Sequence, residues 1–308
     1  MSMAEKTRLG LVGLGSISKK AYMPVLLKEK DWTLSGCYSR SEEKRKAFGE
    51  EYRIKVFDSL EEMAENVDAV VINTSTDSHY EIASFFLERG KHVLMDKPLA
   101  ETVDECEKLV LSSVRNNVNL MVTYNRRFAP MYRFLKDHIT STSLIRIVKN
   151  RSDGIGPKDF EFTLKDDYIH LVDTARWLFD GKLILVDGEL AVNSENQLIY
   201  AEHFFRSPEG CRIQTIMHRD SGLDREILEV ITEGATYRVI DMSVLETEKN
   251  GSLITEYPSP WNTPERLKGF EDAILHFFDV LNREKEPVSN GREALATQRM
   301  IDSIVKSY

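Results

Sequence analysis

Cysteine is scarce in this chain, with only Cys37, Cys106 and Cys211 among its 308 residues. Three scattered thiols are too few for a disulfide framework or a zinc cluster. We therefore expect no metal site. The simplest interpretation of so few cysteines is a reducing compartment, and we expect a cytoplasmic protein.

Long apolar runs and an excess of basic charge are also missing. No stretch approaches the ~20 apolar residues that cross a bilayer. The apolar run after Lys6 and Arg8 is short, interrupted by glycine and without a signal-peptide cleavage site. Basic residues number 41 against 50 acidic ones, which gives a formal net charge of −9. This balance argues against nucleic acid or a membrane as partner, so local donors must hold any bound anion.

The chain is long enough, and at 42% hydrophobic residues apolar enough, to form two packed domains. Its first part alternates helices with apolar, strand-like runs at 8–13, 32–39, 56–57, 68–74, 91–98 and 119–124. This alternation predicts an α/β Rossmann fold, a doubly wound parallel sheet, over residues 1–124.

Residues 125–308 show a different pattern, in which several strand-like runs follow one another. In CRIQTIMH, residues 211–218, apolar and polar positions alternate as in a half-buried strand. Asn250-Gly251 predicts a type I′ hairpin, and Glu233-Gly234 a second turn. We predict an α+β domain with a large, open-faced antiparallel sheet, and self-association through that face. Two predicted helices, over residues 265–284 and 292–308, close the chain, and the C-terminal one is free to pack back toward the first domain.

The segment GLVGLGSIS follows the first strand, where a dinucleotide-binding loop occurs in a Rossmann fold. Gly13 permits a tight turn, and Gly15 lets the backbone approach a pyrophosphate. Ser18 replaces the third glycine, and the small serine nearly satisfies the packing there. Ser16 and Ile17 would open the helix that faces the phosphates. A plain strand–helix turn is the competing interpretation.

The second predicted strand ends at Ser39-Arg40, without the carboxylate that usually contacts the ribose of NAD. A hydroxyl and a guanidinium suit a 2′-phosphate instead, because arginine gives planar, charge-assisted donors. The sequence favours NADP, with NAD possible. Alternatively, Arg40 is a solvated residue at the start of a charged helix.

Two further stretches could carry chemistry. Lys97, in MDKPLA, follows a parallel strand, where it could polarise a substrate oxygen; it could equally be a solvated loop residue. In DDYIHLVD, the residues Asp166, His170 and Asp173 share one predicted helix face. Histidine suits proton transfer near neutrality, and a carboxylate one turn away can orient it. An amphipathic helix with a surface Asp–His pair is the simpler alternative.

Taken in order, these segments resemble the Gfo/Idh/MocA (glucose–fructose oxidoreductase) family. The matching segments are GLVGLGSIS, CYSRSEEKRKAF, INTSTDSHYEIA, VLMDKPLA, VTYNRRFAPMYRFLKD and DDYIHLVDTARWL. The resemblance covers almost the whole chain. NRSDGIGP, DDYIHLVDTA and AEHFF look closest to the MviM-type oxidoreductases of this family.

The resemblance implies roles for particular residues. Lys97 matches the lysine of the family's E-K-P motif, with Asp96 in place of glutamate and a Lys97–Pro98 peptide that is typically cis. Asp166 and His170 match the family's catalytic D-x-x-x-H pair, which would converge with Lys97 at the interdomain cleft. Thr74, His79 and Asn125 match positions that flank the cofactor in the family. Asn125 and Arg127 both belong to a segment that matches the family's N-R-R-F motif.

The resemblance also leaves the function partly open. Tyr168 stands where many family dehydrogenases have glycine, so the substrate pocket is expected to differ. We expect an NADP-preferring dehydrogenase of a sugar-like small molecule. The family also contains cofactor-binding regulators and redox-neutral enzymes, and both alternatives remain. Substrate contacts are expected, in addition, from four polar residues of the second domain, namely Arg127, Arg151, Tyr168 and His218.

Overall fold

The structure is a computed structural model that describes residues 6–283 and 285–308. The chain forms two compact units. The first unit is made of two segments, one that ends at Tyr124 and a second one, Phe270–Gln298. The second unit is made of Asn125–Gly269 and Arg299–Tyr308. The boundary after Tyr124 lies where the sequence pattern changes, but residues 270–298 group with the first unit and not with the second.

The first unit has a five-stranded parallel sheet in the order β2-β1-β3-β4-β5. The strands are β1 Thr7–Val12, β2 Trp32–Tyr38, β3 Ala69–Ile72, β4 His92–Asp96 and β5 Leu120–Thr123. Helices α2 (Glu42–Tyr52) and α3 (Leu60–Asn66) pack against β2, and α4 (His79–Leu87) packs against β3, β4 and α5 (Val103–Arg115). β3 is buried throughout, as expected for a sheet covered on both faces. The predicted Rossmann fold is confirmed.

Local sequence signals account for the helix starts in this unit. Ser41 and Thr102 accept hydrogen bonds from the backbone N–H groups three residues later, and Thr102 forms a full capping box with Glu105. Ser59 also caps its helix. The Glu62 carboxylate, however, accepts from the Asp58 N–H and not from the N-cap residue.

Gly269 interrupts what the sequence suggested was one long helix over residues 265–284. α9 (Pro264–Leu267) ends before it and α10 (Phe270–Arg283) begins after it. Gly269 has φ +81°, and a Cβ there would lie 2.2 Å from the Asn125 carbonyl oxygen. α10 contributes Phe278, whose ring stacks on Trp32 of the first unit with centroids 4.4 Å apart. The last helix is α11, Gly291–Val305.

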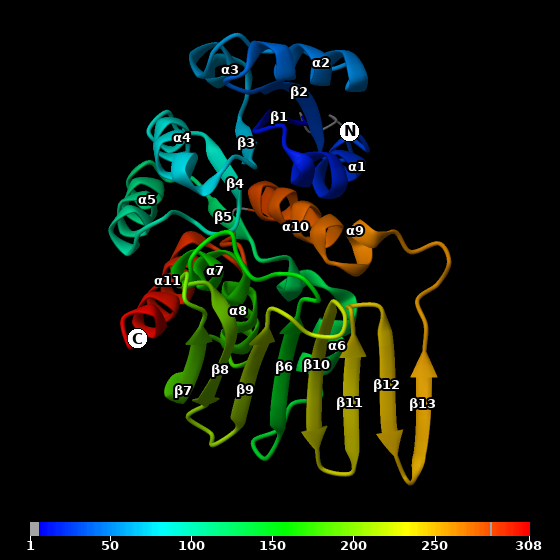
Figure 1. Ribbon diagram of the computed structural model, residues 1–308. Helices are drawn as coiled ribbons and strands as arrows, with labels where there is room; N and C mark the ends of the chain where they lie inside the picture. Colours follow the sequence, from blue (N-terminus) through cyan, green and yellow to red (C-terminus); the bar gives the residue numbers. More distant parts are fainter. Residues whose placement is uncertain (1–5, 284) are drawn as a thin grey trace. The chain divides into compact units, whose positions relative to one another are not determined.

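The second unit contains an eight-stranded sheet in the order β13-β12-β11-β10-β6-β9-β8-β7, seen in a row in Figure 1. Its strands are β6 Leu144–Asn150, β7 Ile184–Val192, β8 Leu198–Arg206, β9 Arg212–His218, β10 Arg225–Thr232, β11 Ala235–Ile240, β12 Val244–Lys249 and β13 Ser252–Glu256. β6 and β9 pair in parallel and all other pairs are antiparallel, so the predicted antiparallel sheet has one parallel pair. Asn250 and Gly251 both have positive φ in the β12–β13 hairpin, as a type I′ turn requires.

One face of this sheet is covered by helices. α6 (Pro130–Lys136) packs on β11, and α8 (Ile169–Leu178) packs on β6 and β9. Alternate residues of β6, namely Ile145, Ile147 and Lys149, are buried on the helix-covered side. α7 (Phe160–Thr163) joins α8 through the π turn η4, Leu164–Tyr168. In the described part of the chain, no helix is long and apolar enough to cross a membrane.

Candidate active site

The carboxyl ends of the parallel strands bring the predicted cofactor residues to one edge of the first unit. The chain leaves β1 toward β2 and later returns to the other side of β1 at β3, so this edge contains the topological switch point of the sheet. Ligands of doubly wound sheets bind at such a point. The residues that follow these strand ends are Gly13, Ser39, Arg40, Thr74 and Lys97.

The glycine-rich turn after β1 is shaped by two different requirements. Gly13 has φ +90°, and a Cβ there would lie 2.6 Å from backbone atoms of Asn73, so only glycine fits. Gly15 is exposed, and no described atom lies within 4 Å of an added Cβ. The fold itself therefore does not require glycine at position 15, whereas the close approach of a ligand would.

Ser18 takes the place of the third glycine and adds a polar connection. Its hydroxyl is buried, donates to the Gly13 carbonyl at 2.7 Å, and accepts from the Asn73 amide at 3.2 Å. The helical segment starts with Ser16 and Ile17 and widens into a π turn, η1, over Ser18–Tyr22 before the short helix α1, Met23–Leu26. Pro24 lies in α1, so it leaves the N-terminal turn undisturbed.

Ser39 and Arg40 lie at the end of β2, as predicted. Arg40 is exposed, which leaves its guanidinium accessible to an anionic ligand. The neighbouring Arg45 is bound more tightly: it donates to the Ser39 carbonyl at 3.3 Å, and its guanidinium lies 5.9 Å from the centre of the Tyr38 ring.

His79 connects the ends of β3 and β4. It is buried, and its ring nitrogens lie 2.8 Å from the Pro98 carbonyl oxygen and 3.1 Å from that of Thr74. Burial lowers the pKa of His79 below its usual value, and the two carbonyl contacts act in the opposite direction. This bridge fixes the Lys97–Pro98 segment, whose peptide is cis, which confirms that expectation.

Asp96 lies at the last position of β4, next to Lys97. Its carboxylate accepts a hydrogen bond from the buried Tyr22 hydroxyl at 3.2 Å. Burial raises the pKa of Asp96, while the adjacent Lys97 opposes that rise. Tyr22 of η1 therefore holds the Asp96 carboxylate at the end of β4, directly before Lys97.

This edge fits a nicotinamide dinucleotide. Asn73 Oδ1 and Thr74 Oγ1 are buried at the end of β3 and have no hydrogen-bond partner among the described residues. Buried polar atoms normally have partners, so the pair indicates a polar ligand. Together with the open approach at Gly15, these atoms suit the phosphate, ribose and amide groups of such a cofactor.

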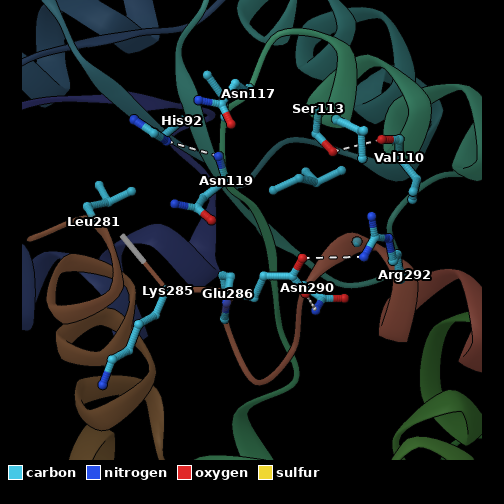
Figure 2. Close-up of a pocket in the computed structure, with 15 residues that line it drawn as sticks. His92, Val110, Ser113, Asn117, Asn119, Leu281, Lys285, Glu286, Asn290 and Arg292 are labelled. Atoms are coloured by element: carbon cyan, nitrogen blue, oxygen red, sulfur yellow. Dashed lines mark hydrogen bonds and ion pairs between the residues drawn. The ribbon is translucent and has the colours of Figure 1, made fainter. Parts of the chain in front are cut away.

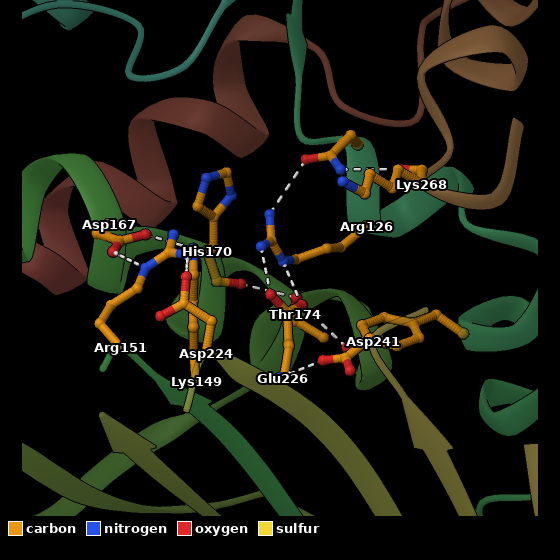
Figure 3. Close-up of polar contacts among 12 residues, drawn as sticks. Arg126, Lys149, Arg151, Asp167, His170, Thr174, Asp224, Glu226, Asp241 and Lys268 are labelled. Carbon is orange, nitrogen blue, oxygen red and sulfur yellow. Dashed lines mark hydrogen bonds and ion pairs between the residues drawn. The ribbon is translucent and has the colours of Figure 1, made fainter. Parts of the chain in front are cut away.

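In the second unit, Asp166 and His170 lie where the π turn η4 passes into α8, and both side chains are partly buried. A π turn takes one more residue per hydrogen-bonded turn than an α-helix. The step from Asp166 to His170 therefore completes close to one turn, and the two residues keep a common side of the helix. In Figure 3 the His170 ring points away from the sheet.

The third member of the predicted helix face does not share this environment. Asp173 is buried and accepts two hydrogen bonds from Arg127, at 2.9 and 2.7 Å. The Arg127 guanidinium is equally buried, in a pair whose side chains are 2% and 1% exposed. The structure therefore does not support the predicted substrate contact of Arg127, which instead joins the turn η3 (Asn125–Phe128) to α8.

Asn125 and Arg126 precede this pair and are also engaged within the second unit. The Asn125 amide donates to the Lys268 carbonyl at 2.8 Å and accepts from Arg126 at 3.2 Å. Arg126 forms two hydrogen bonds, at 2.7 and 2.6 Å, with the buried carboxylate of Glu226. Burial alone would raise the pKa of Glu226, but Arg126 lowers it to about 2.

Asp167, next to Asp166, is the centre of a cationic cluster that we define as Lys149, Arg151, Asp167 and Arg219. Figure 3 shows Asp167 with Lys149 and Arg151. Its carboxylate accepts from Lys149, Arg219 and, at 3.4 Å, Arg151. Burial alone would raise the pKa of Asp167, but the attraction of Lys149 and Arg151 holds it well below the usual range. Burial, reinforced by Arg126, lowers the pKa of Lys149 to about 8.

The remaining predicted substrate residues lie in different environments. Tyr168 is fully buried, and its hydroxyl bonds to His203 Nδ1 at 2.8 Å and Thr215 Oγ1 at 2.6 Å. This makes it a core residue and argues against substrate contact. His218 lies at the end of β9 on the open face, stacked with Tyr200. Arg151 is half-buried beside η4.

A separate cavity of ≈ 670 Å³ lies at the opposite, amino-terminal edge of the first unit's sheet (Figure 2). Its lining includes His92 and Leu120, the first residues of β4 and β5. Glu286, on its rim, is paired with Arg292 at 3.3 Å. None of the predicted site residues lines this cavity, so we do not assign it to the active site.

Within residues 6–283 and 285–308, no group of three or more histidine, cysteine or acidic side chains could hold a metal ion.

The sequence analysis missed Lys149, Asp167, Arg219, Arg126 and Glu226. A signal was present for two of them. In LIRIVKNR, Lys149 shares its alternation with Ile145 and Ile147, and in REILEVIT, Glu226 shares its alternation with Leu228 and Val230. A charge in phase with buried apolar residues indicates a buried ionic partner.

Comparison with known proteins agrees with these two units. Residues 7–124 match the family model "Oxidoreductase family, NAD-binding Rossmann fold", and residues 130–250 match "YceM-like, C-terminal domain". The chain is 41% identical to the "Putative oxidoreductase YceM" of Salmonella typhimurium, over 96% of each chain. It is 31% identical to "scyllo-inositol 2-dehydrogenase (NADP(+)) IolU" of Bacillus subtilis, over 45% of this chain and 43% of that one.

The fold is equally well matched. A crystal structure titled as a dehydrogenase (MviM) from Clostridium difficile superposes with a TM-score of 0.96 and 38% identity, covering 99% of this chain and 100% of that one. Fold, cofactor edge and similarity together define a nicotinamide-dependent oxidoreductase. The chain belongs to the Gfo/Idh/MocA family and resembles its MviM-type members.

Proposed function

We propose that this oxidoreductase transfers a hydride between NADP(H) and a sugar, a polyol or a related hydroxy or keto compound. The observation that carries the proposal is the Asp166–His170 pair, one helical turn apart on a partly buried face of the second unit. Such a pair suits proton exchange with a substrate hydroxyl. The cofactor edge of the first unit would bind the nicotinamide that exchanges the hydride.

Each residue has one role in this proposal. A bound nicotinamide supplies the carbon that accepts or donates the hydride. His170 takes the substrate hydroxyl proton during oxidation and returns it during reduction, and Asp166 orients the imidazole and stabilises its cationic form. The Lys97 ammonium stabilises negative charge on the reacting oxygen. The convergence of Lys97, Asp166 and His170 on that oxygen is part of the proposal.

The cofactor is proposed to be NADP in preference to NAD. The support is the absence of a carboxylate at Ser39-Arg40 and the accessibility of the Arg40 guanidinium. Arg40→Ala should weaken NADPH binding about 10-fold or more, as loss of a charge-assisted bond to phosphate does, and should leave NADH binding nearly unchanged. Titration of cofactor fluorescence with both nucleotides measures this. Equal losses for NADPH and NADH would remove the 2′-phosphate role from Arg40.

The substrate class is supported by the names of relatives, among them the inositol dehydrogenase of Bacillus subtilis. A panel of sugars, polyols and their oxidised forms, followed by NADPH absorbance, tests the activity. We expect steady turnover of at least one compound. Tight cofactor binding without turnover of any compound would favour a sensor, and an absorbance change confined to a transient would favour redox-neutral chemistry.

We further propose that the chain forms a homo-oligomer through the uncovered face of the second unit's sheet. Leu144, Phe204 and Ile231 lie on strands of this sheet at alternation positions opposite to the buried apolar residues, and they are between 41% and 51% exposed. Apolar side chains of this size on one face favour self-association. Light scattering should give a mass of at least two chains, lowered to one by Phe204→Glu. A single-chain mass for the unchanged protein would contradict this.

A further inference from the structure

Arg151 is held in place along its backbone and side-chain stem. Its N–H donates to the His218 carbonyl at 2.9 Å, and its carbonyl accepts from the Ser221 N–H at 2.7 Å. A Cβ added at Gly154 would lie 2.7 Å from the Arg151 Cβ and 3.1 Å from the Arg219 guanidinium carbon. Glycine at position 154 therefore lets both arginine side chains pack closely against that backbone.

The guanidinium head of Arg151, in contrast, is only weakly engaged. Its two ion pairs, with Asp167 and Asp224, measure 3.4 and 3.5 Å, and the side chain is 38% exposed. Asp167 is already neutralised by Lys149 and Arg219, whose side chains are 6% and 13% exposed. Asp224 is 61% exposed and is bound more closely by the Ser152 N–H and hydroxyl, at 2.9 and 3.0 Å.

The charges of the cationic cluster do not cancel. Three cations, Lys149, Arg151 and Arg219, surround the single carboxylate of Asp167, and Asp224 offsets one of them. Among these ion-paired groups, three cations face two carboxylates, in a protein whose formal net charge is −9. The most accessible donor of this cluster is Arg151.

The cationic cluster lies beside the proposed proton-transfer residue. Asp167 lies in the π turn η4, three residues before His170 at the start of α8. Arg151 contacts Asp167 directly, and Figure 3 shows its guanidinium on the same side of the sheet as the His170 ring. One small molecule can therefore present a hydroxyl to His170 and an anionic group to Arg151.

We infer that the substrate is an acidic sugar derivative, bearing a carboxylate or a phosphate, and that Arg151 binds this anionic group. The inference rests on the proposed hydride transfer at His170. A planar guanidinium whose stem is fixed loses little freedom on binding and can give two parallel bonds to an oxyanion. Arg151 would thus bind the anionic group of the substrate, and His170 would bind its reacting hydroxyl.

The test compares each acid with its neutral parent. Reduction of NADP⁺ by the full-length protein is measured with D-glucose, D-gluconate, D-glucuronate and D-glucose 6-phosphate. At least one acid should exceed D-glucose in kcat/KM by about 10- to 100-fold, the effect of one to two charge-assisted hydrogen bonds. Comparison of the two carboxylates with D-glucose 6-phosphate shows whether a carboxylate or a phosphate is the preferred anion.

Arg151→Gln should abolish this preference by raising KM for the acid more than it raises KM for D-glucose. Arg206→Gln is the matched control, because Arg206 is an exposed arginine on β8 of the same unit. Calorimetric binding of the acids to the NADPH-bound protein gives a second measurement that needs no turnover.

The outcomes separate the inference from the proposed function. Binding of an acid that depends on Arg151, without turnover of any compound, would support the inference and contradict the hydride transfer. Turnover of D-glucose equal to that of all its acids would overturn the inference alone. An equal loss in the Arg151 and Arg206 variants, or no binding of any acid, would overturn it as well.

Discussion

His170→Ala should lower kcat by about 10²–10⁴-fold, which is the usual contribution of a positioned general acid or base. The reason is that His170 is the one residue assigned to exchange the hydroxyl proton, while none of the cofactor contacts involves it. NADPH affinity should stay unchanged, because the nucleotide edge belongs to the other compact unit. Steady-state kinetics together with fluorescence titration of NADPH measures both quantities.

Two controls make this expectation specific. His138→Ala removes another half-buried histidine of the same unit, whose Nδ1 contacts the Phe134 carbonyl, and should leave kcat nearly unchanged. Asp166→Asn keeps the shape of the partner but removes its charge, so it should lower kcat less than His170→Ala. If His170→Ala reduced kcat no more than His138→Ala does, His170 would have no part in the chemistry.

The cofactor edge could be predicted from sequence because its signals are local. A glycine turn after the first strand has few structural solutions, and Gly13 adopts the conformation that only glycine tolerates there. The hairpin at Asn250-Gly251 was predictable for the same reason. In both cases the residues that determine the backbone are neighbours in sequence, so no knowledge of distant contacts was needed.

The second unit was less predictable because its polar contacts join distant segments. Tyr168 was assigned to the substrate from its place between Asp166 and His170, yet its hydroxyl meets Thr215, 47 residues away. Arg126 and Glu226 are 100 residues apart. The π turn also has no simple sequence signature, and it moves Asp167, not Asp166, toward Lys149 and Arg219. Alternation identified which side of a strand was buried, but not which charges met there.

Arg127→Ala should lower the free energy of unfolding by about 3–5 kcal/mol, because it leaves the buried Asp173 carboxylate without this guanidinium. The pair joins residues 46 positions apart through two short hydrogen bonds, and its side chains are 2% and 1% exposed. Urea denaturation followed by circular dichroism and tryptophan fluorescence measures the change. Both probes are needed because the two compact units can unfold in separate steps.

The matched control removes both charges together. Arg127→Met combined with Asp173→Leu leaves no buried ion, so this double variant should be more stable than either Arg127→Met or Asp173→Leu alone. Such a result would show that the single variants lose stability through an uncompensated charge and not through lost volume. A loss below about 1 kcal/mol for Arg127→Ala would instead mean that water or another side chain reaches Asp173.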